Sequence, residues 1–207
     1  MGSQLWWYCA RAGGIVAWGL LSASVLWGLV MSTKLKPPKV RPAWMLDLHR
    51  FLGGLATIFV GVHIGSILLD SYTHFGLADV LVPFTSAWHP GAVAWGVVAL
   101  YVLLTVELTS LARRYLPNKV WRRIHVASLP LYGLATIHFL VAGTDAHDTV
   151  ARLFMFAVTA AVVGLTIVRV SALHKRPTAT PRPPASPVTR PQTAPIDPLL
   201  EPVGAGR

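Results

Sequence analysis

Four histidines lie inside long apolar stretches of this sequence and form two regularly spaced couples. His49 and His63 are 14 residues apart, and His125 and His138 are 13 residues apart. A polar side chain within a membrane span is costly and is usually functional. A neutral imidazole is also a good ligand for heme iron, because one ring nitrogen can bind the metal while a hydrogen bond orients the other. The couples therefore predict two heme sites, provided that the two stretches face each other at matching depths.

The composition indicates a membrane protein. Of the 207 residues, 54% are hydrophobic and only 13% are charged, whereas about 25% of the residues in soluble domains are charged. Five stretches reach the roughly 20 apolar residues that a spanning helix needs. We predict an all-α bundle of five transmembrane helices at residues 13–31, 48–70, 91–112, 124–143 and 149–170.

Lys and Arg residues cluster in alternate loops, which sets the expected orientation. They occur in the first loop, in the third loop and after the last span, whereas the second loop has none and the fourth has Arg152 alone. The positive-inside rule places the basic loops in the cytoplasm and the N-terminus outside. Because this topology accounts for the net charge of +10, we expect the lipid bilayer and no nucleic acid as a partner.

The domain organisation follows from the same pattern. We predict an extracytoplasmic N-terminal segment at residues 1–12, a five-helix heme-binding domain at 13–172 and a cytoplasmic tail at 173–207. The tail holds more than half of the sixteen prolines. Such a composition cannot bury a core, so the tail should be disordered.

The second and fourth predicted helices both start at cytoplasmic loops, so they run in parallel. His49 and His125 then lie near the cytoplasmic ends, and His63 and His138 lie about 20 Å further along, at a rise of about 1.5 Å per residue. Each histidine therefore has a counterpart at its own depth. The rotation is left open, because 13 residues turn the fourth helix by roughly 140°. A kink at Pro130 either restores the facing or sets the two hemes on different sides of that helix.

Two segments resemble a known family: LDLHRFLGGLATIFVGVHIG at 46–65 and WRRIHVASLPLYGLATIHFLVAGTD at 121–145. The pattern is similar to the ferric reductase-like transmembrane domain. That family includes the membrane halves of NADPH oxidases and ferric reductases, and the heme-binding subunit of the bacterial periplasmic methionine sulfoxide reductase. The resemblance covers about residues 11–170. It implies a transmembrane b-type cytochrome of a bacterial plasma membrane, with two heme b groups that serve electron transport. It also implies that His49 and His125 ligate the inner heme iron, and that His63 and His138 ligate the outer one.

The sequence departs from this family in two ways. Many members have six spans, and many are fused to a flavin and nicotinamide domain, whereas this chain has five predicted spans and no Gly-rich nucleotide fingerprint. We therefore expect the heme-bearing membrane subunit of an oxidoreductase, with a separate flavoprotein or quinol as electron donor and a separate acceptor. The sequence gives no support for a bound flavin and predicts no catalytic side chain.

Charged residues near the predicted sites have two interpretations each. Arg50, Arg122 and Arg123 lie at the cytoplasmic interface, within reach of the propionates of an inner heme, although topology alone also places arginines there. Glu107 lies in the third predicted helix. Its carboxyl could relay protons, brace a ligand imidazole or extend toward the interface.

Glycines next to the histidines are also open to two interpretations. Gly53 lies one turn from His49, and Gly61 and Gly65 flank His63. Glycine allows the close approach of either a macrocycle or another helix.

Two other functions compete with electron transfer. A Zn or Cu transporter would use the same imidazoles, but transport usually needs acidic or thiol groups along the path. Glu107 is the acidic group available within a predicted span, and Cys9 lies outside the spans. A non-catalytic membrane adaptor would leave the histidine spacing as coincidence.

Overall fold

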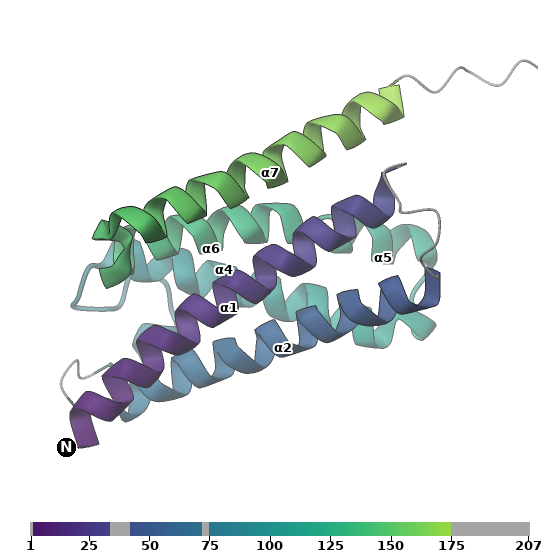
Figure 1. The fold of residues 1–207 in the computed structure, drawn as a ribbon. Coiled ribbons are helices and arrows are strands. Elements are labelled where there is room, and N and C mark those ends of the chain that lie inside the picture. The colour runs from purple at the N-terminus through teal and green to yellow at the C-terminus, as the bar shows by residue number, and fades with distance from the viewer. Residues whose placement is uncertain (1, 34–41, 72–74, 175–207) are drawn as a thin grey trace, which may run out of the picture. The chain divides into compact units, whose positions relative to one another are not determined.

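The structure, a computed structural model, describes residues 2–33, 42–71 and 75–174. Its regular elements are all helices, and the described residues contain no strand (Figure 1). This confirms the all-α prediction. The predicted tail from residue 175 onward and the basic residues of the first loop lie outside the described ranges, whereas residues 173 and 174 of the predicted tail belong to α7. The elements are α1 Gly2–Ser32, α2 Pro42–Leu69, α3 Leu77–Leu81, α4 Pro90–Leu111, η1 Ala112–Tyr115, α5 Asn118–His125, α6 Ser128–Ala142, η2 Thr144–His147 and α7 Thr149–His174.

Five helical stretches of the described chain are long and apolar enough to cross a membrane. They are Gln4–Ser32, Ala43–Leu69, Pro90–Tyr115, Asn118–Ala142 and Thr149–Ala172. The number of spans agrees with the prediction and indicates a multi-pass membrane protein. The first helix is longer than predicted, because most of the expected N-terminal segment belongs to α1.

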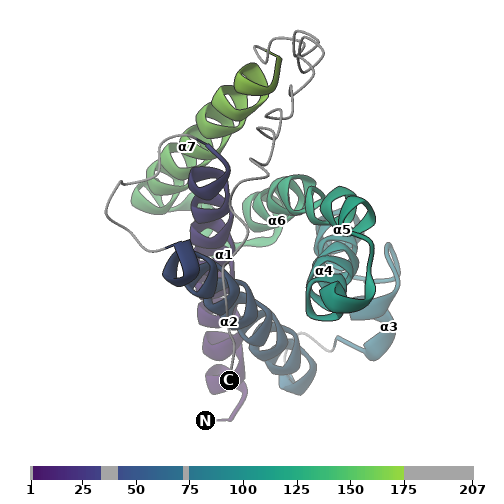
Figure 2. The same cartoon turned by 90° about the vertical axis from the view of Figure 1, so that its right-hand side faces the viewer.

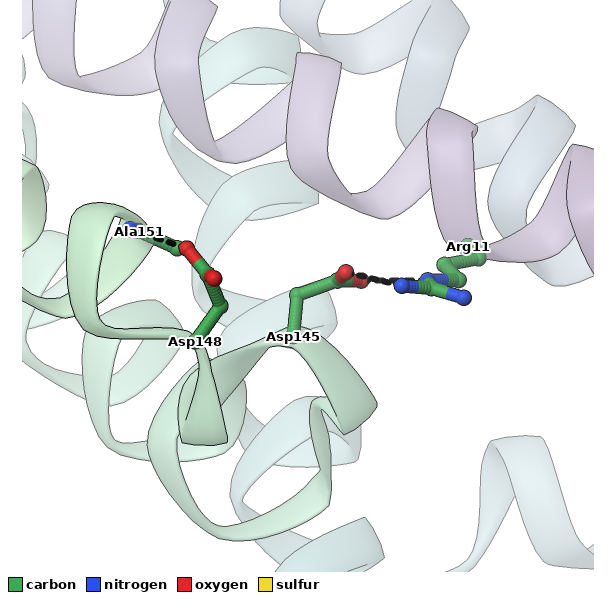
Figure 3. A network of polar contacts seen from close by, with 4 residues as sticks. All are labelled: Arg11, Asp145, Asp148 and Ala151. Atoms are coloured by element: carbon green, nitrogen blue, oxygen red, sulfur yellow. Dashed lines mark hydrogen bonds and ion pairs between the residues drawn. The ribbon is translucent and has the colours of Figure 1, made fainter.

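Local sequence signals explain where several helices begin. Pro42 and Pro90 are the first residues of α2 and α4, a position where proline costs no hydrogen bond because its missing N–H would be unpaired there anyway. Asp148 precedes α7 and accepts a hydrogen bond from the Ala151 backbone N–H at 2.8 Å (Figure 3). An aspartate in this position satisfies one of the free N–H groups at a helix start.

The fourth span is interrupted directly after His125. Helix α5 ends there, and α6 begins at Ser128. Pro130 has no N–H to donate to the carbonyl of Val126 one turn earlier, and its ring would clash with that carbonyl in a regular helix. The Leu129 N–H bonds the Val126 carbonyl instead, at 3.1 Å. The predicted kink at Pro130 thus takes the form of a break that lies just upstream of it.

Helix α1 is the element that joins the others. It lies between α2 and α7 in Figure 1 and also contacts α6. Trp18 of α1 is buried, donates its indole N–H to the Thr136 hydroxyl at 3.0 Å and stacks on Phe139 with ring centres 5.6 Å apart. Helix α2, in contrast, packs along α1 but makes few contacts with α4 (Figure 2). The histidines lie where these two parts of the bundle face each other.

Candidate functional site

The four predicted histidines form two facing pairs. The inner pair is His49 of α2 and His125 of α5, with ring centres 5.8 Å apart and ring planes at 78°. The outer pair is His63 of α2 and His138 of α6, with ring centres 6.4 Å apart and planes at 75°. Each pair joins the two residues that the sequence places at the same depth. The break between α5 and α6 allows both histidines of the fourth span to face α2.

Hydrogen bonds fix the orientation of three of the four rings. In each, Nδ1 lies within hydrogen-bond distance of a backbone carbonyl on a neighbouring helix. The pairs are His63 with Ala10 at 2.7 Å, His138 with Ala92 at 2.8 Å and His49 with Ser24 at 3.1 Å. A carbonyl oxygen only accepts, so Nδ1 carries the hydrogen, and in the neutral ring Nε2 keeps its lone pair. Metal-binding histidines commonly have this arrangement, with one nitrogen oriented by the protein and the other free for the metal.

A glycine follows each of these three carbonyls after one helical turn. A Cβ on Gly96 would lie 2.7 Å from His138, one on Gly14 would lie 3.0 Å from His63, and one on Gly28 would lie 3.2 Å from His49. The missing side chain therefore makes room for the imidazole against the helix backbone. We call each such unit a carbonyl–glycine pair: Ala10 with Gly14, Ser24 with Gly28, and Ala92 with Gly96.

The fourth histidine has a serine in the place of the glycine. Ser110 lies four residues after Val106, and its hydroxyl donates to the Val106 carbonyl at 2.6 Å. The same hydroxyl oxygen lies 3.4 Å from Nδ1 of His125. In the inner pair, Nδ1 of His49 therefore lies near both the carbonyl and the hydroxyl of Ser24, at 3.1 and 3.3 Å, whereas for Nδ1 of His125 a hydroxyl contact alone is seen among the described residues.

These units recur at a spacing that the sequence shows. In α1 the glycines are Gly14 and Gly28, and in α4 the corresponding residues are Gly96 and Ser110, so both spacings are 14 residues. This matches the spacing of the histidines in α2. The sequence alone drew attention to other glycines, namely those next to the histidines on α2. A Cβ on Gly61 or on Gly65 would meet nothing within 4 Å in the structure, so no helix of the described chain packs on them.

An apolar cavity of about 310 Å³ adjoins the outer pair. His63 and His138 line it together with Gly14, Gly96 and Trp18. Most of the other lining residues are apolar side chains of α1, α2, α4 and α6. Volumes of about 300–1,000 Å³ are typical of ligand sites. The outer histidines therefore face a space of ligand size with little polar surface.

An ion pair lies at the border of this cavity. Arg11 of α1 donates two hydrogen bonds to the Asp145 carboxylate, one of them from Nε at 2.5 Å (Figure 3). Both residues line the cavity. The guanidinium holds the pKa of the Asp145 carboxyl below its ordinary value. The ion pair ties α1 to η2, the turn that precedes α7.

The predicted arginines of the inner site occupy different places. Arg50 lines a shallow cleft, together with Arg113 and Arg114. Arg122 and Arg123 are exposed on α5 and do not line this cleft.

Glu107 of α4 faces α2. Its Oε1 would lie 2.9 Å from a Cβ on Gly53, one turn from His49. The carboxyl is therefore directed toward α2.

Three other histidines are described, and they lie in other elements than the two pairs. His89 precedes α4, His147 lies in η2 and His174 ends α7, whereas His74 lies outside the described residues. Over the ranges that the structure describes, no group of three or more His, Cys, Asp or Glu side chains could hold a metal ion. Metal binding at the histidines would therefore use two protein ligands for each ion.

Comparisons with protein-family models, with curated proteins and with solved structures find no match for this chain. The interpretation of the site therefore depends on its geometry and its chemistry.

Proposed function

We propose that this chain is a transmembrane b-type diheme cytochrome, the electron-transfer subunit of a ferric reductase-like oxidoreductase system. The observation that carries the proposal is the presence of two depth-matched histidine pairs whose rings face each other. In three of the four rings Nδ1 is already occupied by a carbonyl, which leaves Nε2 for a metal. Two protein ligands for each metal suit heme iron, since the porphyrin supplies the other four.

The ring separations fit two imidazoles on one metal ion. A metal–imidazole bond is about 2.0–2.1 Å long and the ring centre lies about 1.1 Å beyond the nitrogen, so the two centres would be about 6.2–6.4 Å apart. The outer pair, at 6.4 Å, lies within this range. The inner pair, at 5.8 Å, needs its rings to separate by a few tenths of an ångström.

The surroundings of the pairs also suit a flat apolar group. The outer pair faces the 310 Å³ cavity, and Gly14 and Gly96 leave its histidines room against the helix backbone. Helix α2 has no extensive packing against α5 or α6, which carry the partner histidines, so a group held between the histidines would not have to separate two packed helices.

The protein's own groups would hold and tune the two sites. Heme bound between the histidines would supply one-electron transfer between ferric and ferrous iron. The two histidines of each pair would hold one heme, and the carbonyls that accept from Nδ1–H would raise the basicity of Nε2. With two protein ligands on each iron, substrates would not bind the metal directly, so the subunit would act as a conduit between a separate donor and a separate acceptor.

The orientation completes the proposal. We place the chain in a bacterial plasma membrane, as the family resemblance implies. The distribution of Lys and Arg puts its N-terminus outside and its C-terminus in the cytoplasm. The inner pair then lies toward the cytoplasm and the outer pair toward the outer face. The two sites are separated by about 20 Å along the helices, from a rise of about 1.5 Å per residue.

The test is a reduced-minus-oxidised absorption spectrum of the purified protein, with heme and protein quantified. We expect a b-type α band on dithionite reduction and about two hemes per chain. His63→Ala or His138→Ala should each remove one heme and leave the other. His147→Ala, in η2, is the matched control and should keep both. A colourless protein, expressed with ample heme, would contradict the proposal and favour the transporter or adaptor.

A further inference from the structure

A shallow cleft at the inner end of the bundle is rich in positive charge. Arg50, Arg113 and Arg114 line it together with Ser110, and none of its described lining residues is acidic. Arg50 makes an exposed ion pair of 3.8 Å with Asp47. Arg113 and Arg114 have no ion pair with any residue that the structure describes. The cleft therefore suits an anion, and arginine forks suit a carboxylate or a phosphate best.

The cleft adjoins the inner histidine pair. Ser110 lines it, and the hydroxyl of that residue lies 3.4 Å from Nδ1 of His125. The Arg113 guanidinium lies over the Trp121 ring, 4.2 Å from its centre. That ring stacks on His125, with centres 4.9 Å apart and planes at 22°. Arg50, moreover, directly follows a histidine of the pair.

Trp121 has a hydrogen-bond donor without a partner. Its indole N–H is shielded from solvent, and no acceptor in the described residues bonds it. Buried donors of this kind are rare in folded proteins. Trp121 does not itself line the cleft, so its N–H adds an unused donor next to His125, and the arginines of the cleft are what favour an anion there.

We propose that Arg113 and Arg114, together with Arg50, bind the carboxylates of the inner heme. This inference rests on the proposed function and adds the residues that hold the polar edge of the group. It differs from the sequence-based expectation, in which Arg122 and Arg123 accompany Arg50. Those two arginines lie on the same short helix as His125 but do not line the cleft.

The charge of these arginines has a measurable consequence. A positive charge near the iron stabilises the ferrous state relative to the ferric state, because the ferrous site has one positive charge fewer. Replacing Arg113 and Arg114 by glutamine should therefore lower the reduction potential of one heme. We expect about a tenfold change in the ferrous-to-ferric ratio at a fixed ambient potential, which for one electron corresponds to about 59 mV.

Arg122→Gln with Arg123→Gln is the matched control. It removes the same charge from the same cytoplasmic end, within three residues of His125, but from outside the cleft. The experiment is a spectroscopic redox titration of the intact chain in detergent and in neutral lipid, with heme content measured for each variant. We expect the larger fall in potential, for one heme of the two, in the Arg113 and Arg114 double variant.

Three outcomes would overturn the inference. Equal shifts in the two double variants would show that general surface charge acts, and would leave the proposed function standing. An unchanged potential, with loss of co-purified anionic phospholipid in the Arg113 and Arg114 variant, would assign the cleft to a lipid phosphate. A wild-type protein without heme would remove the proposed function and this inference together.

Discussion

Replacing Gly96 by alanine tests the geometry of the outer pair most directly. Gly96 lies on α4, one turn after the Ala92 carbonyl that orients His138. The change adds one methyl group and no charge. It should expel the heme of the outer pair and leave that of the inner pair in place.

The magnitude follows from the distances. The new Cβ would lie 2.7 Å from Cε1 of His138, 2.9 Å from Nδ1 and 3.0 Å from Nε2. Ordinary contacts of a Cβ begin at 3.4 Å, so the ring has to move by about 0.7 Å, whereas a metal–ligand distance tolerates about 0.2 Å. Because the overlap extends over the ring, a small rotation does not relieve it. The ring has to leave either the carbonyl or the metal.

The assay is the heme-to-protein ratio with the reduced spectrum. Gly96→Ala should lower the ratio from about two to about one, and retention of the inner heme shows that the bundle has folded. Gly133→Ala on α6 is the control, because its Cβ would meet nothing within 4 Å, and it should keep both hemes. Gly14→Ala and Gly28→Ala should have progressively smaller effects, since their closest contacts are 3.0 and 3.2 Å. A Gly96→Ala protein with two hemes and an unchanged spectrum would refute this reasoning.

Three further changes test other parts of the structure. Ser110→Gly should let Nδ1–H of His125 donate to the Val106 carbonyl, a stronger acceptor than the hydroxyl. The more basic imidazole should stabilise ferric iron and lower the reduction potential of one heme in a redox titration, and an unchanged or raised potential would contradict this. Pro130→Ala restores an N–H for the Val126 carbonyl and should favour a continuous helix, which would rotate His125 away from α2 and reduce inner heme content. Unaltered heme content would show that the break does not depend on proline. Asp145→Asn should lower the thermal midpoint in detergent at pH 7. Because Arg11 lowers the pKa of Asp145, this stabilisation is present above the ordinary value of about 3.9 and is lost as the pH falls through the lowered pKa. The difference between wild type and Asp145→Asn should therefore shrink toward pH 3, and a constant difference would argue against the ion pair.

Much of the site could be predicted because membrane helices impose simple rules. Apolar length gives the spans, and the spacing of His49 and His63 against that of His125 and His138 gives the depths. Those rules were sufficient to choose the same-depth pairing that the structure shows. They work because depth along a helix depends on residue number alone.

Rotation and the supporting groups could not be predicted in the same way. The sequence indicates a kink at Pro130, but the break after His125 depends on which carbonyl loses its partner and on how the chain compensates. The carbonyls of Ala10 and Ala92 are backbone atoms with no residue signature. Gly14 and Gly96 are visible in the sequence as glycines, but they lie on α1 and α4, the antiparallel neighbours of the histidine helices. Their role can be recognised only when it is known which helices pack together.

The position of the break has a consequence for the two sites. A spacing of 14 residues turns a helix by about 40° from its starting face, so histidines and acceptors at this spacing in α1, α2 and α4 stay on nearly one side. The 13-residue spacing of His125 and His138 would turn them about 140° apart in a continuous helix. Because the break lies directly after His125, that residue belongs to the short helix α5, whereas His138 belongs to the longer α6. His138 is held by a carbonyl at 2.8 Å, whereas His125 has a hydroxyl contact at 3.4 Å. The inner pair is therefore the one whose rings can separate by the few tenths of an ångström that a bound metal requires, by a shift of α5 that leaves the outer pair unchanged.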